Sequence, residues 1–241
     1  MRKYYYDLHL HSCLSACADN DQTPYNIVGM AKLSGLDIVA LTDHNTTANC
    51  PAFFKACEEY GLVAVGGMEL TTSEDIHVVC LFPTLENTMA FGSEMDAYRT
   101  KVKNRKEIFG EQYLVDENDE VIGEDPYLLS VATSISIEEV FDYVKKHNGI
   151  CYPAHIDRDS YSVTAVLGVF PMHLPFPAFE LHDGKKEDEM RARYGLQNKM
   201  MICSSDAHTL EDIRDGEYFI LLEEGLCDAD AVRRVLFEKF R

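Results

Sequence analysis

The sequence predicts an α/β fold built on a largely parallel sheet, with its functional groups at one edge of that sheet. Strand-like and helix-like segments alternate through the first 70 residues, the order typical of strand–helix–strand units. Four strand-like segments finish in histidine or acidic residues, and the carboxyl ends of parallel strands meet at one edge. At 241 residues the chain has room for one α/β barrel, and we expect a single domain over residues 1–241.

Local signals mark where the first helices begin and end. Thr23 and Pro24 have the pattern of an N-cap followed by proline at the first helical position. Gly35 and Gly61 each follow an amphipathic segment and are typical helix stops. The elements expected from these signals are helices over 24–34 and 51–60, and strands over 37–42, 62–70 and 77–82.

Residues 85–135 interrupt the alternation of strands and helices and are expected to form an insertion. The segment 85–110 has the pattern of a long polar helix, and 112–123 that of a hairpin turning at 116–119. Because it follows the strand 77–82 directly, we expect the insertion to act as a lid over the site. The alternation of helices and strands then resumes with a capping box at Ser136 and Glu139. The remaining predicted elements are helices over 136–147, 186–194 and 230–240, and strands over 150–155, 178–182, 200–205 and 218–222.

Net charge and the distribution of apolar residues limit the kinds of molecule that this protein is expected to bind. The net charge of −19 opposes strong binding to duplex nucleic acid, although a short oligonucleotide remains compatible with it. No segment approaches the roughly 18 consecutive apolar residues of a membrane span, and the first residues carry no apolar signal region. We therefore expect a cytoplasmic protein with no membrane partner. Its eight cysteines form no Cys-x-x-Cys pair and are expected to be reduced thiols.

Histidine and acidic residues make the strongest functional signal. His9 and His11 are two apart in an alternating segment, so their side chains share one face of a strand. A lone histidine at a strand end is more often structural, but several at one edge favour a metal site. Cys17 is an alternative ligand, because thiolate is a soft zinc ligand. The candidate ligands, each at or just beyond the end of a predicted strand, are His9, His11, His44, Glu69, His77, His155, Asp206 and His208.

These eight residues exceed the needs of one ion. A structural zinc site is closed by four ligands and is usually rich in cysteine, whereas mixed imidazole and carboxylate donors suit two or three catalytic ions with open positions. A carboxylate such as Glu69 can bridge two ions.

The motifs resemble those of the PHP (polymerase and histidinol phosphatase) family of metal-dependent phosphoesterases. The resemblance covers nearly the whole chain except 85–135. It implies a distorted (β/α)7, TIM-like barrel that holds two or three divalent ions, usually zinc, manganese or iron, at the C-terminal ends of its strands. The motifs that carry it are DLHLHS at 7–12, LTDHN at 41–45, GMEL at 67–70 with His77, PAH at 153–155 and SDAH at 205–208.

The resemblance also implies a distribution of ligands. One ion would be held by His9, His11, Glu69 and Asp206, and a second by Glu69, His77 and His155. His44 and His208 would hold a third, which many relatives complete with an acidic residue or histidine five positions after the second histidine of the first motif. That position is Ala16 here, which cannot ligate, and Asp19 is the nearest substitute.

Metal-assisted hydrolysis explains what such a cluster does. Paired ions generate a bound hydroxide near neutral pH and stabilise the leaving oxygen, so Glu69 and Asp206 are catalytic as ligands. Asp43 is expected to fix the tautomer of a ligating imidazole. Arg158 is the best phosphate contact, because arginine grips two phosphate oxygens, although a surface ion pair with Asp157 or Asp159 is the alternative. His182 and Lys185 are further substrate-binding candidates.

The sequence thus predicts a hydrolase of a small phosphorylated substrate, such as a sugar or amino-alcohol monophosphate or a nucleotide. Three alternatives remain open. An exonuclease acting on short oligonucleotides would use the same ions. Other amidohydrolase barrels also begin with a His-x-His strand, and a metal-stabilised domain without catalysis would serve a regulatory role.

Overall fold

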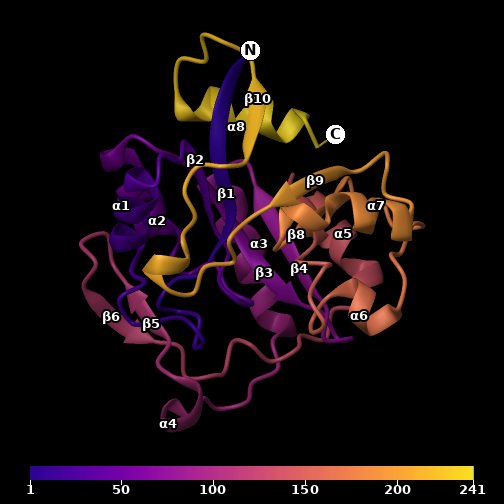
Figure 1. Ribbon diagram of the computed structural model, residues 1–241. Coiled ribbons are helices and arrows are strands. Elements are labelled where there is room, and N and C mark those ends of the chain that lie inside the picture. The colour runs from indigo at the N-terminus through magenta and orange to yellow at the C-terminus, as the bar shows by residue number, and fades with distance from the viewer. Residues whose placement is uncertain (241) are drawn as a thin grey trace.

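An open, curled sheet forms the centre of the molecule. The computed structural model describes residues 1–240 (Figure 1). A two-stranded parallel sheet, β8 (Ala178–Leu181) and β9 (Met200–Cys203), lies beside β7, and together the two sheets form a half-barrel. The larger sheet has six strands, in the spatial order β10 (Phe219–Leu222), β1 (Arg2–Leu10), β2 (Ile38–Leu41), β3 (Val63–Thr71), β4 (His77–Phe82) and β7 (Ile150–Pro153).

Strand direction departs from the predicted parallel order at two places. β1, β2 and β3 are parallel, but β4 is antiparallel to both β3 and β7, and β10 is antiparallel to β1. Only residues 72–76 join β3 to β4, and a connection that short permits an antiparallel pair but not a parallel crossover. His77 opens β4, as the predicted strand 77–82 has it, so the expectation that it lies at the carboxyl end of a strand is wrong. It still reaches the ligand edge, because it pairs with Thr71 at the end of β3.

Alternating side chains divide the apolar residues into an inner core and outer layers. On β2, Ile38 and Ala40 pack inside the half-barrel, whereas Val39 and Leu41 pack outward against the first two helices. The helices are α1 (Pro24–Leu33), α2 (Cys50–Tyr60), α3 (Leu85–Met95), α5 (Ile137–Lys146), α6 (Val163–Leu167), α7 (Glu187–Tyr194) and α8 (Ala229–Glu238). Within residues 1–240, none of the helices combines the length and apolar character needed to cross a membrane.

The predicted helix signals are confirmed. The Thr23 hydroxyl accepts a hydrogen bond from the backbone of α1, and Gly61 ends α2 with a positive φ of 70°. Ser136 and Glu139 form the reciprocal capping box at the start of α5. These local contacts explain why the first helices begin and end where the sequence places them.

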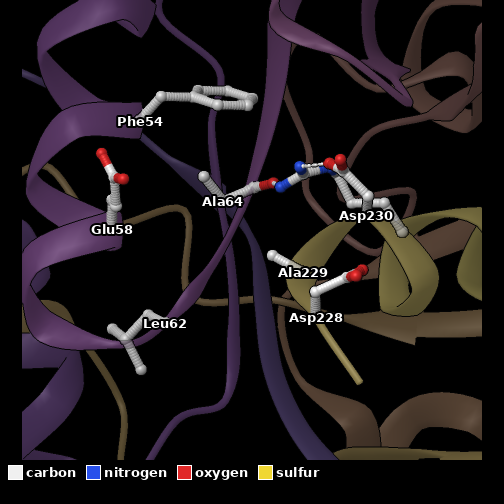
Figure 2. A pocket seen from close by; sticks show the side chains of 8 residues that line it. Phe54, Glu58, Leu62, Ala64, Asp228, Ala229 and Asp230 are labelled. Atoms are coloured by element: carbon white, nitrogen blue, oxygen red, sulfur yellow. Dashed lines mark hydrogen bonds and ion pairs between the residues drawn. The ribbon is translucent and has the colours of Figure 1, made fainter. Parts of the chain in front are cut away.

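The amino-terminal end of the half-barrel is covered by α8. Val232, Leu236 and Phe237 of this helix belong to the inner core. Figure 2 shows a cavity between α2 and α8, beside the first residues of β3. Its volume is about 330 Å³. There Arg233 donates to the carbonyl of Ala64 at 3.0 Å. Packing and this hydrogen bond close the end of the half-barrel opposite the ligand edge.

The insertion contains the predicted hairpin but not the predicted long helix. The hairpin consists of β5 (Tyr113–Val115) and β6 (Val121–Glu124), and α4 (Lys106–Phe109) is a single turn. After α3 and a short 3-10 turn, the chain extends instead, and the backbone of Leu128 donates to the carbonyl of Val102 at 2.8 Å. This tertiary pairing outweighs the helical propensity of 99–105. Figure 1 shows the hairpin and α4 at the end of the molecule toward which β1 runs.

Candidate metal centre

A β-bulge in β1 aims both histidines of the first motif into the half-barrel. Asp7 pairs with Val39, and Leu10 pairs with Leu41. Between these two pairs β1 contains one more residue than β2. Leu8 consequently packs in the inner core, whereas Leu10, two residues later, packs in the outer layer. The bulge exchanges the two faces, so His9 and His11 point toward the inside. The predicted shared face is present, and the bulge decides which face it is.

Four residues from three distant segments meet at this point. The Nε2 atoms of His9 and His11 are 3.2 Å apart. Glu69 Oε1 lies 3.2 Å from His9 Nε2, and Asp206 Oδ1 lies 3.3 Å and 3.1 Å from the two Nε2 atoms. These atoms form one potential metal-binding group, made of the same four residues that the resemblance implies for one ion.

Glu69 is the centre of a second potential group, which contains His44 and His77; the resemblance implied His155 where this group has His44. Its Oε2 lies 3.0 Å from His44 Nδ1, and its Oε1 lies 2.8 Å from His77 Nδ1 and 3.2 Å from His155 Nε2. One carboxylate therefore faces imidazoles from both groups, as a bridging ligand must. A third potential group contains His11, His44 and His208. The carboxylate of Asp19 belongs to none of the three groups, although its backbone N–H donates to the His208 carbonyl at 2.9 Å.

The charge balance of the cluster fits divalent cations. Buried atoms of five of these residues make no hydrogen bond of good geometry, although several of them lie close to one another: Glu69 Oε2, His44 Nδ1, His77 Nδ1, His155 Nδ1 and Asp206 Oδ1. Leaving buried polar atoms unpaired costs about 1–3 kcal/mol each, so a cation that engages them stabilises the site. Burial alone would raise the pKa of Glu69, but the adjacent imidazoles hold that pKa well below its usual range. Burial lowers the pKa of His11 and of His77, which keeps both rings neutral as ligands.

Glu180 fixes the orientation of His9. This carboxylate is buried, and its Oε2 accepts from His9 Nδ1 at 2.9 Å and from the backbone N–H of His155 at 3.0 Å. With the proton on Nδ1, the lone pair of His9 Nε2 faces the cluster. The same carboxylate holds the backbone of His155, whose φ of 27° is unusual for a residue other than glycine.

Asp43 acts on an imidazole through Ser15. The Ser15 hydroxyl donates to Asp43 Oδ1 at 2.7 Å, so it accepts from His11 Nδ1 at 3.0 Å and from the backbone of His44 at 3.2 Å. This arrangement leaves His11 Nε2 free for a metal. Asp43 thus occupies a tautomer-fixing position, and the imidazole it serves is that of His11, not that of its sequence neighbour.

Two arginines converge beside the ligands. Arg158 Nη1 donates to Asp206 Oδ2 at 2.5 Å, and its Nη2 lies 3.0 Å from His182 Nδ1. Arg214 Nη2 lies 3.2 Å from the same His182 nitrogen. Burial, followed by these two guanidinium groups, lowers the pKa of His182 and keeps its ring neutral. Both arginines and His182 line a cavity of about 390 Å³ that also contains Asp206 and His208.

The other predicted substrate contact lies apart from this cavity. The backbone of Lys185 donates to the Asp183 carboxylate at 3.1 Å, and its side chain is exposed. Arg158 pairs with Asp206 and not with either neighbouring aspartate, so the expected alternative of a simple surface pair does not describe its contacts.

Four residues of the site were not predicted from the sequence: Ser15, Glu180, Arg214 and Tyr161. The ring of Tyr161 stacks on His77 at 4.7 Å, and Tyr161 lines a second cavity with the ligands. Glu180 left a usable signal, because a carboxylate in the apolar strand Ala178–Leu181 needs a buried partner. Arg214 and Tyr161 lie in irregular segments and left no comparable pattern.

The family model for the PHP domain matches residues 7–162, more than half of the chain. A 5'-3' exoribonuclease from Haemophilus influenzae is 35% identical over 79 residues, which are 32% of this chain and 28% of that protein. The chain spans less than half the length of the curated relatives it matches.

Solved structures share the fold. A lesion-specific endonuclease from Pyrococcus furiosus superposes with a TM-score of 0.65 at 20% identity, over 98% of this chain and 56% of that one. A protein from Bifidobacterium adolescentis, assigned as a metal-dependent phosphoesterase, superposes with a TM-score of 0.60 at 22% identity, over 97% and 96% of the two chains.

Proposed function

This chain belongs to the PHP domain family, and from that premise we propose that it hydrolyses a small phosphorylated substrate with the help of two or three divalent ions. A metal-dependent hydrolase is the coarser statement that the family and its fold support. The phosphate ester is the finer one, and it rests on the residues beside the ligands.

The observation that carries the proposal is the position of Arg158 and Arg214. The molecule has a net charge of −19, yet two guanidinium groups flank His182 in the cavity that Asp206 and His208 also line. Cations placed beside a metal centre in so acidic a protein favour an anionic substrate. Guanidinium groups match the geometry of phosphate oxygens, which favours a phosphate.

Each residue has a defined part in this proposal. Zinc, manganese or iron, when bound, supplies Lewis acidity and activates water at neutral pH. The ligating residues hold the ions, and Glu180 and Asp43 keep His9 and His11 in the correct tautomer. Arg158 exchanges its contact with Asp206 for the substrate phosphate, while His182 holds both arginines toward the cavity.

Short oligonucleotides are the second candidate substrate, and Tyr161 favours them. Its half-exposed ring lies at the rim of the ligand cavity, where it provides a stacking surface for a base. The similarity to an exoribonuclease points the same way. The acidic surface argues against long duplexes, which need a basic track.

The test measures phosphate release from sugar, amino-alcohol and nucleoside monophosphates, and nucleotide release from a short oligonucleotide, after reconstitution with manganese or zinc. We expect His9→Ala to abolish release. Arg158→Ala and Arg214→Ala should each lower kcat/KM by about 10–100-fold, the factor for losing a charged hydrogen bond. Lys32→Ala, on the exposed face of α1, is the control. Bound metal without release from any phosphorylated substrate would instead favour amide hydrolysis or a regulatory role.

A further inference from the structure

The hairpin of the insertion is fastened to the loop after β1 and to the first turn of α2. The backbone N–H of Tyr113 in β5 donates to the Cys13 carbonyl at 2.9 Å. Cys13, Val115 of β5 and Ala52 of α2 form a small apolar cluster between these segments. The hairpin is therefore held against the loop that begins with the ligand His11.

Asn49 is the polar link between the hairpin and that loop. It is the N-cap residue of α2, where an asparagine side chain usually accepts from the backbone of its own helix. The fully buried side chain of Asn49 turns to the hairpin instead, and its Oδ1 accepts from the backbone N–H of Val115 at 3.1 Å. Its Nδ2 donates to the Tyr113 carbonyl and to Ser12 Oγ, both at 3.0 Å. These backbone partners fix the orientation of the amide, because exchanging its oxygen and nitrogen would set donor against donor and acceptor against acceptor.

Ser12 connects Asn49 to the residues that orient His11. The Ser12 hydroxyl has a single proton, and Asn49 Nδ2 is a donor to it, so the proton is donated to Asp43 Oδ2 at 2.6 Å. The backbone N–H of Ser12 donates to Asp43 Oδ1 at 2.7 Å. Asp43 also accepts from Ser15, whose hydroxyl accepts from His11 Nδ1. The four residues of this chain of hydrogen bonds, which we call the relay, are Asn49, Ser12, Asp43 and Ser15.

We propose that Asn49 is a positioning residue of the metal centre, through which the hairpin holds His11 by way of the relay. The relay keeps the proton of His11 on Nδ1 and directs the lone pair of Nε2 toward the ions. All four of its members are buried, which strengthens their hydrogen bonds by excluding water. The hairpin is then a fixed support of the metal centre and not a lid that opens over it. This inference rests on the metal centre of the proposed function and is independent of the identity of the substrate.

Three substitutions separate the relay from the anchoring of the hairpin. Ser12→Ala removes the hydroxyl between Asn49 and Asp43 but leaves both contacts of Asn49 with the hairpin backbone. Asn49→Ala removes the relay contact and the two hairpin contacts together. Asp119→Gly is the matched control, because it frees the tip of the hairpin from the start of α1 without touching the relay. The φ of Asp119 is 61°, which glycine adopts without strain.

The experiment uses the full chain loaded with zinc. Competition with a chromophoric chelator measures the zinc affinity, and NMR measures how fast the His11 Nδ1 proton and the Val115 amide proton exchange with water. The His11 signal is the one that is absent from His11→Gln. We expect Ser12→Ala to weaken zinc binding by about 10–100-fold, and to speed the exchange of the His11 proton but not that of Val115. Asn49→Ala should change all three quantities, whereas Asp119→Gly should keep the zinc affinity and the His11 exchange rate of wild type.

Wild-type zinc affinity and slow exchange of the His11 proton in both Ser12→Ala and Asn49→Ala would overturn the inference. A loss in Asn49→Ala with Ser12→Ala unchanged would also overturn it, because the hairpin would then act on the site by another route. Equal weakening in Asp119→Gly would trace the effect to the hairpin alone and count against the relay. Phosphate release does not enter these readouts. A chain that responds as expected but cleaves no phosphate ester would refute the proposed function and leave the positioning role of Asn49 established.

Discussion

Glu180 lies outside the ligand set, and we expect it to control metal affinity through His9. Its charge holds the His9 proton on Nδ1 and so directs Nε2 toward the cluster. We expect Glu180→Gln to weaken metal binding by about 10–100-fold, the usual effect of removing such a partner. Competition with a chromophoric chelator measures the affinity. Glu138→Gln, which disturbs a surface pair with His173, is the control and should bind metal as wild type does. Equal affinities for the two variants would contradict this role.

At the residue scale, ligand types could be predicted because each lies in a short motif. His9, His44 and Asp206 all follow apolar strand segments, and that local pattern is visible in a single sequence. Glu180 and Arg214 could not be assigned in the same way. Glu180 meets His9 across 171 positions of sequence, and Arg214 meets His182 only because β8 and β9 are neighbours. Such contacts depend on the tertiary fold.

Asn45 joins three elements at the ligand edge. Its Nδ2 donates to the carbonyls of Leu129 at 2.7 Å and Val131 at 3.0 Å, and its Oδ1 accepts from the Thr71 backbone at 2.8 Å. It therefore ties the insertion to the ends of β2 and β3. Asn45→Ala should lower the free energy of unfolding by about 2–4 kcal/mol, because these buried groups lose their partners.

The backbone of Asn45 supplies a matched comparison. Its φ of 51° lies in the left-handed region, which glycine adopts freely and alanine does not. Asn45→Gly should therefore be more stable than Asn45→Ala by about 1 kcal/mol in urea denaturation. If both variants unfold at the wild-type urea concentration, the insertion is not held through this residue.

The pairing of α3 with α5 gives a pH-dependent prediction. Glu94 accepts from Lys146 Nζ and lies against His147 Nε2, both at 2.6 Å, and these contacts lower its pKa. Because the pKa of Glu94 is lowered in the folded protein, its charged form adds to the free energy of unfolding at pH values above the ordinary pKa of 4.5. That stabilisation is lost as the pH falls through the lowered pKa of the folded state. Glu94→Gln should cost about 0.5–1 kcal/mol at pH 7, the range for a partly exposed pair.

Denaturation at several pH values tests the predicted direction of this pH dependence. The difference between wild type and Glu94→Gln should shrink as the solution becomes acidic. Glu86→Gln, at the exposed start of the same helix, should stay within about 0.5 kcal/mol of wild type. A difference that persists unchanged in acid would mean that charge is not the origin of the effect.

At the element scale, sequence signals that span about four residues predicted the ends of helices correctly. The directions of the strands could not be predicted in this way. Caps fix α1 and α5 from their own sequences, as the Thr23 and Ser136 hydrogen bonds show. The reversal of β4 depends on the brevity of 72–76, which the alternation of strands and helices does not reveal. The segment 99–105 extends because 126–128 lies beside it, and no local pattern anticipates that pairing.

Across the whole molecule, the two sheets meet at two places: β8 lies beside β7, and the segment after β9 approaches the end of β1, where the ligands gather. The amino-terminal half of β1 pairs with β10, and β9 approaches β1 only beyond its own end. There the backbone of His11 donates to the Ala207 carbonyl at 3.1 Å, and Leu8 donates to Ser204 Oγ at 3.3 Å. Ligands from β1 and β3 face Asp206 across this junction, so bound ions join the two sheets.

Metal removal should therefore weaken the fold as well as the activity. At free metal about 1,000-fold above Kd, one site adds about 4 kcal/mol to the free energy of unfolding. For a chain of this size that corresponds to a rise in Tm of about 8–16 °C. Thermal unfolding with excess zinc and with a chelator measures the difference, and His9→Ala should lose most of it. Hydrogen exchange at the β1–β9 junction should quicken when the ions are removed, because the junction then relies on few hydrogen bonds. An unchanged Tm would mean that the half-barrel closes without its ions, and that the ligand cluster serves chemistry alone.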